Sequence, residues 1–118
     1  MPLEPGDIAW VALDPVKGSE QAGRRPALIV SSAVYNEASR RTVICPITRS
    51  IRPWPFNVPL PPGLETAGAV LVDQIRSIDR AERIFDFVER VPPEVLASVR
   101  GQLAALFGLD AVSLISGT

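Results

Sequence analysis

The chain has 118 residues, of which 47% are hydrophobic and 21% are charged, and its formal net charge at pH 7 is −1. These values are those of an ordinary folded protein, and the length predicts a single domain over residues 1–118. The near-neutral charge argues against indiscriminate binding to nucleic acid, and no apolar run approaches the roughly 20 residues that span a bilayer.

Short apolar runs separated by turn residues predict a mostly β domain. The strand candidates are 7–14, 25–31, 41–48, 55–60, 69–78 and 84–91. The polar stretch 32–40 has room for a helical turn, and DRAER, before the last strand, is typical of a turn. Several short strands at this spacing indicate a small barrel or sandwich.

The last regular element is predicted to be an amphipathic helix. Apolar residues at spacings of three and four place one stripe on its surface, formed by Leu96, Val99, Leu103 and Leu106. Pro93 suits the first turn of a helix, and Gly108 suits its end. The sequence therefore predicts a mostly β domain with a C-terminal helix.

The connection between the first two strands, DPVKGSEQAGRRP at 14–26, is unusually long, because two to five residues suffice to join neighbouring strands. Length and polarity of this kind are expected of a loop that carries function, although a solvated hairpin with incidental charge would have the same composition. Residues 17–52 contain seven basic and two acidic residues. A local basic surface on a near-neutral protein is therefore expected.

The chain contains one cysteine, Cys45, and no histidine. The lone cysteine, in an apolar setting, predicts a buried thiol, and with the absence of a secretion signal in MPLEPGD it predicts a cytoplasmic protein without a membrane partner. Without histidine, the usual zinc, Ser-His and Cys-His sites are excluded or poorly supported, and we expect no metal and no cofactor. Guanidinium groups remain, and they match phosphate oxygens in charge and geometry.

Six stretches follow one another along the chain: GDIAWVALDPVKGSEQAGRRPALIVS, VYN at 34–36, CPIT at 45–48, PWPFNV at 53–58, LVDQIRSID at 71–79 and PPEVLASVRGQLAALFG. With these motifs the chain resembles the MazF/PemK toxin family over nearly its whole length. The resemblance implies an SH3-like small barrel, a homodimer and a metal-independent ribonuclease that cuts single-stranded RNA at short sequences. It also implies a labile antitoxin, whose acidic C-terminal segment covers the RNA channel.

The same resemblance assigns roles to individual residues. Arg25 matches the family's catalytic arginine and Thr48 its catalytic threonine, at the ends of two adjacent strands. Residues 15–24 would form the loop beside the RNA channel. The residues expected to bind RNA are Lys17, Ser19, Glu20, Gln21, Arg24, Arg49, Trp54, Gln74, Arg76 and Ser77.

The implied reaction is attack of a ribose 2′-hydroxyl on the neighbouring phosphate, which leaves a 2′,3′-cyclic phosphate and a 5′-hydroxyl. Arg25 would stabilise the dianionic transition state, and Thr48 would bind a phosphate oxygen. The base stays open, because an arginine remains protonated and is a poor proton acceptor. Asp73 of the DQ motif is one candidate for the base, and it equally suits the task of orienting Arg25.

Other interpretations remain at this point. Arg25 would also suit a surface ion pair with Asp14 or Glu20, and Thr48 would suit an ordinary strand end. The CcdB gyrase poisons share the implied fold and are binders, but they are expected to end in Trp-Gly-Ile, whereas this chain ends in Ile-Ser-Gly-Thr. A catalytically inactive interaction module is the third alternative, and the presence of both Arg25 and Thr48 counts against it.

Overall fold

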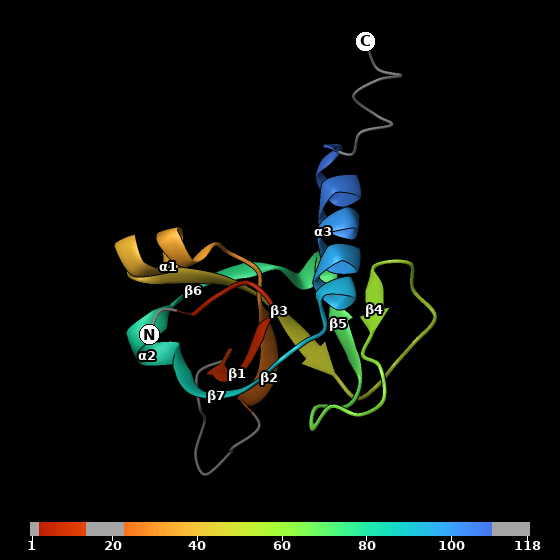
Figure 1. Ribbon diagram of the computed structural model, residues 1–118, viewed down its shortest axis with the longest axis horizontal. Coiled ribbons are helices and arrows are strands. Elements are labelled where there is room, and N and C mark those ends of the chain that lie inside the picture. The colour runs from red at the N-terminus through yellow and green to blue at the C-terminus, as the bar shows by residue number, and fades with distance from the viewer. Residues whose placement is uncertain (1–2, 14–22, 110–118) are drawn as a thin grey trace.

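An antiparallel β-sheet that wraps into an open, barrel-like shape forms the centre of the fold (Figure 1). The computed structural model describes residues 3–13 and 23–109, and within them the chain forms seven strands, three helices and one 3-10 turn. The strands are β1 (Asp7–Ala12), β2 (Arg24–Ile29), β3 (Arg41–Thr48), β4 (Asn57–Pro59), β5 (Ala69–Leu71), β6 (Arg76–Asp79) and β7 (Ile84–Arg90). The helical segments are α1 (Ala33–Ala38), η1 (Val72–Gln74), α2 (Arg80–Arg83) and α3 (Pro93–Phe107). The prediction of a mostly β small barrel with a C-terminal helix is confirmed.

β3 is the strand on which the sheet is organised. The strand order is β4-β5-β3-β2-β1-β7, and β6 also pairs with β3. β2 lies along residues 44–46 of β3, β6 along residues 41–44, and β5 along residues 47 and 48. The last two residues of β3 therefore continue past the end of the β2 ladder and pair with β5 alone.

The predicted strand over 69–78 is wrong in one respect, because the structure divides it into β5 and β6. Between the pairs Ile47–Val70 and Ile44–Arg76, β3 advances three residues while its partner chain uses six. The excess is taken up by η1, whose Val72 is fully buried and donates its N–H to the Phe56 carbonyl at 2.9 Å. A continuous apolar run does not reveal such an insertion, because its residues are buried in either conformation.

The other elements follow the predicted pattern with smaller differences. The candidate strand 55–60 is confirmed at 57–59, and the helical turn within 32–40 is α1. DRAER forms the short helix α2, whose N-terminus is capped by the Asp79 carboxylate, which accepts the Glu82 N–H at 3.0 Å.

One face of α3 packs on the barrel core. Val95 and Val99 are buried there, and Leu96 and Leu103 are partly buried against the same core. The predicted stripe is thus confirmed at three of its positions, whereas Leu106 lies outside the core cluster and Val95 takes its place. The helix ends at Gly108, as predicted, in the left-handed conformation that glycine adopts without strain.

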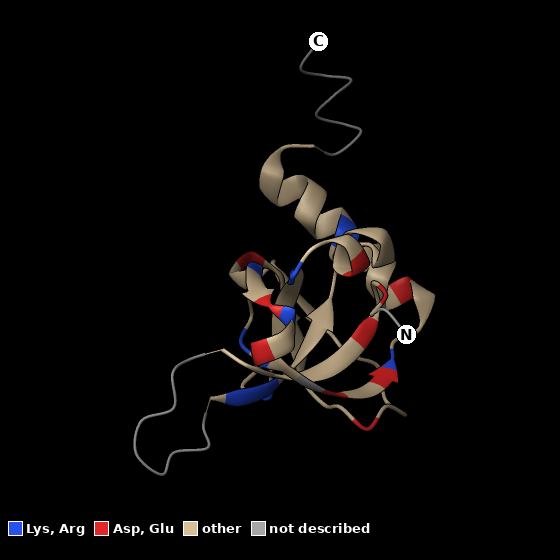
Figure 2. Cartoon of the chain, turned by 90° about the vertical axis from the view of Figure 1, so that its left-hand side faces the viewer, with Lys and Arg blue, Asp and Glu red and all other residues tan. Residues whose placement is uncertain are grey.

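Basic and acidic residues are spread over many elements of the chain, and β2 begins with two arginines (Figure 2). Arg90 at the end of β7 lies 3.0 Å from the Asp7 carboxylate and 3.4 Å from that of Glu4, which ties the outer strand to the N-terminal segment. None of the described helices has the length and apolar character needed to cross a membrane.

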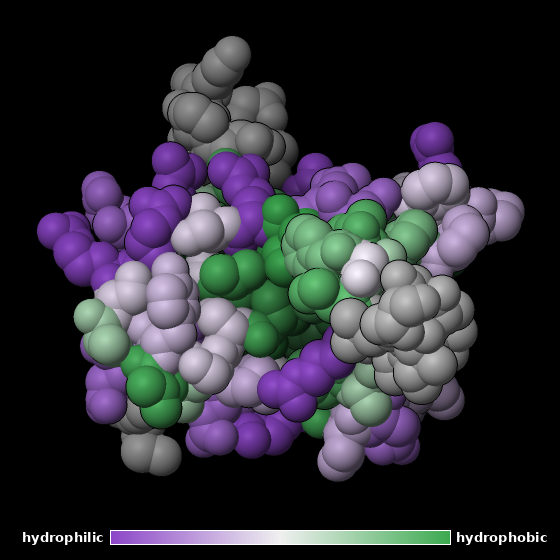
Figure 3. Space-filling view, turned by 90° about the horizontal axis from the view of Figure 1, so that it is seen from above, coloured by the Kyte–Doolittle hydropathy of each residue, from purple (hydrophilic) through white to green (hydrophobic). Residues whose placement is uncertain are grey.

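An apolar area surrounds the outer part of α3 on the face seen in Figure 3. Phe107 and Leu109, at the end of the helix, are more than half exposed. Polar residues border this area on several sides (Figure 3).

Gly68 is the position at which the loop before β5 touches the end of β3. Its φ is +127°, and a Cβ atom built there would lie 2.0 Å from the carbonyl oxygen of Thr48. Both the conformation and the contact therefore require glycine. The backbone of Thr48 is held in place by this approach.

Replacing Gly68 with alanine is expected to lower the free energy of unfolding by about 1–3 kcal/mol from the strained backbone alone, with the clash adding to this loss. Urea denaturation measures the effect. The matched control is Gly101→Ala in the exposed part of α3, where nothing lies within 4 Å of the new Cβ, and where we expect a gain of about 0.5–1 kcal/mol. A Gly68→Ala protein as stable as the wild type would show that the loop does not pack on Thr48 in this way.

Candidate active site

The candidate site lies where the ladder between β2 and β3 ends. The last pair is Ala27–Pro46, and the same register continued by two residues would place Arg25 opposite Thr48. Pro26 and Pro46 have no N–H to donate, so proline stands on both strands at this end of the ladder. Beyond it the strands are free to separate, and the structure has a pocket between them.

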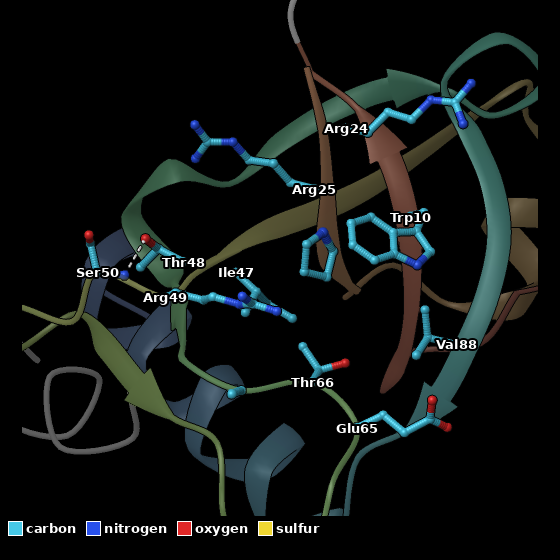
Figure 4. A pocket seen from close by; sticks show the side chains of 12 residues that line it. Trp10, Arg24, Arg25, Ile47, Thr48, Arg49, Ser50, Glu65, Thr66 and Val88 are labelled. Carbon is cyan, nitrogen blue, oxygen red and sulfur yellow. Dashed lines mark hydrogen bonds between the residues drawn. The ribbon is translucent and has the colours of Figure 1, made fainter. Parts of the chain in front are cut away.

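We call this opening the Trp10 pocket (Figure 4). It encloses about 510 Å³ between β1, β2, the end of β3, β7 and the loop that precedes β5. Its lining consists of Trp10, Arg24, Arg25, Pro26, Ile47, Thr48, Arg49, Ser50, Glu65, Thr66, Ala67 and Val88. Its lining is mixed, because apolar side chains such as Trp10 and Val88 alternate with arginines, hydroxyl groups and the carboxylate of Glu65.

A second opening, the Trp54 hollow, adjoins the first and has a volume of about 380 Å³. Its lining consists of Arg25, Thr48, Ser50, Arg52, Trp54, Asn57, Leu71, Asp73 and Gln74. Arg25, Thr48 and Ser50 border both openings. A third opening, of about 430 Å³, is also bordered by Arg25, together with Gln74 and Arg76. Arg25 and Thr48 thus stand at a junction, and not at the bottom of one isolated cleft.

The hydroxyl of Thr48 is oriented by the backbone that follows it. Thr48 Oγ1 accepts the N–H of Ser50 at 3.1 Å. Because this bond uses an oxygen lone pair, the hydroxyl proton stays available for donation to an acceptor such as a phosphate oxygen.

Trp54 is held over its hollow by Asp73. The indole Nε1–H donates to Asp73 Oδ2 at 2.9 Å, and the Trp54 ring lies 6.1 Å from that of Phe56. The Trp54 side chain is nevertheless 52% exposed. The arrangement presents an aromatic surface whose orientation is fixed.

The arginines at the junction point in different directions. Figure 4 shows the Arg25 side chain extending toward the Thr48 and Ser50 side, whereas Arg24 extends the opposite way. This follows from their neighbouring positions in β2, because successive side chains of a strand alternate between faces. The other arginines that border the three openings are Arg49, Arg52 and Arg76.

Most of the sequence-predicted residues come together at this junction. Those that border one of the three openings are Arg24, Arg25, Thr48, Arg49, Trp54, Asp73, Gln74 and Arg76. Ser77 borders none of the three, and its hydroxyl accepts the Nε–H of Arg41 on β3 at 2.8 Å. Lys17, Ser19, Glu20 and Gln21 lie outside the described residues, as does Asp14.

Sequence reasoning missed Trp10, Ser50 and Thr66. Trp10 carried no usable signal, because alternation along DIAWVA would place it on the same face as Ile8, which is buried, and irregularities in the pairing of β1 with β7 break that pattern. Thr66 carried none, because its place in the pocket depends on contacts with β7.

Cys45 is buried on β3, close to the junction but turned into the core. Burial, together with the nearby carboxylate of Asp73, raises the pKa of this thiol from 9.0 to about 12. A thiol of this kind is protonated at neutral pH and is a poor nucleophile. The predicted buried thiol is confirmed, and Cys45 is a packing residue.

Comparison with known proteins gives a coherent set of relatives. The family model described as "PemK-like, MazF-like toxin of type II toxin-antitoxin system" matches residues 4–107. The endoribonuclease toxin MazF of Escherichia coli K12 is 39% identical over 103 residues, which cover 87% of this chain and 92% of that protein. The endoribonuclease PemK of Escherichia coli is 40% identical over 108 residues, which cover 88% and 81% respectively.

Solved structures agree with these relatives. A crystal structure of MazF from Deinococcus radiodurans superposes with a TM-score of 0.80 at 38% identity, and the match covers 92% of this chain and 98% of that one. A MazE–MazF structure from the same organism gives a TM-score of 0.79 at 35% identity, with 93% and 99% covered.

The raised pKa of Cys45 predicts low reactivity in the folded protein. At pH 8 we expect an aromatic disulfide reagent to modify the thiol slowly, and to modify it completely once the protein is denatured. Because the unfolded chain loses this proton first, the contribution of Cys45 to stability is full below about pH 9 and falls as the pH rises toward about 12. Cys45→Ala should lack this part of the alkaline loss, and rapid modification of the native protein would contradict the assignment.

Proposed function

The chain belongs to the PemK-like, MazF-like toxin family of type II toxin–antitoxin systems and is an endoribonuclease toxin, and we propose that it cuts single-stranded RNA at the junction of the Trp10 pocket and the Trp54 hollow. The observation that carries this proposal is the placement of Arg25 and Thr48 at the open end of the β2–β3 ladder, where both border both openings. A phosphate at the junction would meet both side chains, and the nucleotides on either side of it would enter the two openings.

The proposed reaction is an internal transfer. The ribose 2′-oxygen forms a bond to phosphorus, the bond from phosphorus to the 5′-oxygen breaks, and the products carry a 2′,3′-cyclic phosphate and a 5′-hydroxyl. The guanidinium of Arg25 stabilises the negative charge that grows on the phosphate oxygens, and the Thr48 hydroxyl donates to one of them. The nucleophile belongs to the RNA itself, so we propose that no metal-bound water is needed.

Asp73 is our candidate for the proton acceptor. Among the described residues that line the Trp54 hollow it is the one carboxylate. A guanidinium remains protonated and cannot take the 2′-hydroxyl proton readily. The hydrogen bond from Trp54 to Oδ2 fixes the carboxylate in the hollow, and the proton passes through solvent to the departing 5′-oxygen.

The surroundings of the junction suit an unpaired strand. Arginines border all three openings and would contact successive phosphates. The exposed face of Trp54 would stack on a base, which requires that the base is not already stacked within a duplex. We propose that the cleavage sequence is read by the two openings on either side of the scissile phosphate.

We further propose that the protein is a homodimer whose RNA channel is closed by an antitoxin. The apolar area around α3, with Phe107 and Leu109 exposed, offers a surface for self-association (Figure 3). One of the solved structures with this fold is a MazE–MazF structure. An acidic C-terminal segment of a cognate antitoxin would complement the arginines at the junction and exclude RNA from it.

Arg25→Ala is expected to slow the chemical step about 10²–10³-fold, since it removes a charge that binds the transition state more strongly than the ground state. Thr48→Ala should slow it less, because a neutral hydroxyl makes a weaker bond than a charged donor. Single-turnover cleavage of a defined single-stranded RNA measures both rates, and mapping of the product ends identifies the cyclic phosphate.

The matched control for these variants is Arg24→Ala, which removes the same charge from the neighbouring position but from a side chain that points away from Thr48 (Figure 4). It should weaken binding with little effect on the rate at saturating RNA. Normal cleavage by Arg25→Ala, or a loss explained entirely by a lower melting temperature, would show that Arg25 has a structural role.

Cleavage is expected to continue in EDTA and to weaken as the salt concentration rises, because the arginines act by neutralising phosphates. The same sequence in a duplex should be a poor substrate. Cleavage rates at several salt concentrations, with and without EDTA, provide the measurement. Activity that disappears in EDTA and returns with magnesium would overturn the metal-independent reaction.

A further inference from the structure

Glu89 of β7 holds the wall of the Trp10 pocket, although it does not line the pocket itself. Its Oε1 accepts the N–H of Glu65 at 3.0 Å, and its Oε2 accepts both the N–H and the hydroxyl of Thr66 at 2.8 Å. One carboxylate thus takes three hydrogen bonds from two consecutive residues of the loop before β5. Glu65, Thr66 and Ala67 of this loop form the pocket wall that faces Arg25 and Thr48.

The electrostatics of Glu89 agree with this role. Partial burial by itself would raise the pKa of the carboxyl, but the donors from Glu65 and Thr66 favour its charged form and lower the pKa below its usual value. The carboxylate is therefore charged at neutral pH, and charge-assisted bonds are the stronger class of hydrogen bond.

The rest of the loop is fixed at both ends. The N–H of Leu60 donates to the Gly68 carbonyl at 2.9 Å, which closes the loop, and Leu64 packs against the core. Gly68 lies directly on the backbone of Thr48. The wall formed by residues 65–67 is consequently fastened to β7 by Glu89 and to the candidate catalytic strand by Gly68.

The opposite side of the pocket is an aromatic surface. Trp10 is 42% exposed, although it lies in the middle of β1, and Ile47 and Val88 are near it in the lining. A flat apolar surface of this kind favours a nucleobase over a phosphate, whereas the arginines favour the phosphate. The volume of about 510 Å³ is within the range of small-molecule sites.

We propose that the Trp10 pocket is a nucleobase subsite beside the scissile phosphate, and that Glu89 is the positioning residue that sets its shape. The inference rests on the proposed ribonuclease function. It adds that the Trp10 pocket binds a base, and that Glu89, outside the pocket, controls which base is accepted. A base would stack on Trp10 and meet the 65–67 wall with its edge. If the wall moves, bases of different shape are accepted alike.

The test uses full-length protein and single-stranded RNAs that differ at one position at a time around the cleavage site. For each position, the ratio of kcat/KM between the best and the worst base is the selectivity. Trp10→Leu removes the stacking surface, and Glu89→Ala releases the opposite wall. We expect both variants to lose about tenfold in selectivity at the same single position, mainly through a higher KM for the preferred base.

Two further variants separate positioning from general effects. Glu89→Gln keeps the shape and part of the acceptor capacity, so its loss should be smaller than that of Glu89→Ala. Glu94→Gln removes a similar charge from the exposed first turn of α3 and should leave the selectivity at wild-type level. Because a partly unfolded preparation lowers every rate by the same factor, the ratio is insensitive to a purely structural loss.

The outcomes are distinct. Loss of selectivity at one shared position in Trp10→Leu and Glu89→Ala supports the subsite. The subsite proposal is overturned if the wild-type protein cuts RNA but either variant keeps its selectivity, or if the two variants lose selectivity at different positions. The proposed ribonuclease function is unaffected by that result. Failure of the wild-type protein to cut any of the RNAs overturns the proposed function and the subsite with it.

Discussion

The end of the β2–β3 ladder is the constraint on which the site depends. Proline at position 26 removes a donor that would face β3, because the bond from the Val30 N–H to the Val43 carbonyl and the register of the ladder make positions 26 and 47 a hydrogen-bonded pair. Arg25 and Thr48 therefore stand at facing register positions without a ladder between them, and the gap becomes the junction of two openings. Since β5 takes over the pairing at the end of β3, the strand stays ordered up to Thr48 although β2 has left it.

Several carboxylates accept hydrogen bonds or form ion pairs within the fold. Asp79 caps α2, Glu89 holds the loop before β5, and the pKa of each is lowered: for Asp79 mainly by the Glu82 N–H, and for Glu89 because its donors outweigh the effect of burial. Asp7 lies against Arg90, and Asp73 accepts from Trp54. Of these carboxylates Asp73 alone borders one of the three openings, so a chain with a net charge of −1 still presents arginines around them.

One tryptophan borders each of the two openings that meet at the junction, and the two are positioned by different means. Trp54 is oriented by a hydrogen bond to Asp73, whereas Trp10 is placed by its position on β1. Arg25 borders both openings, so each opening combines an aromatic side chain with this shared cation. A single strand of RNA has bases on either side of each phosphate, and this correspondence links the fold to the activity of the family.

The sequence by itself determined the mostly β class, the C-terminal helix with its end at Gly108 and the burial of Cys45, whereas for Arg25 and Thr48 it supplied a hypothesis. Periods of 2 and 3.6 residues report which side chains are buried, and a motif keeps its spacing along the chain. The tertiary structure alone decided the η1 insertion within 69–78, the bond from Trp54 to Asp73 and the hold of Glu89 on Thr66. All three features depend on strand register. The two hydrogen bonds join residues that are separated by 19 and by 23 positions along the chain, and no local sequence pattern encodes the register that brings them together.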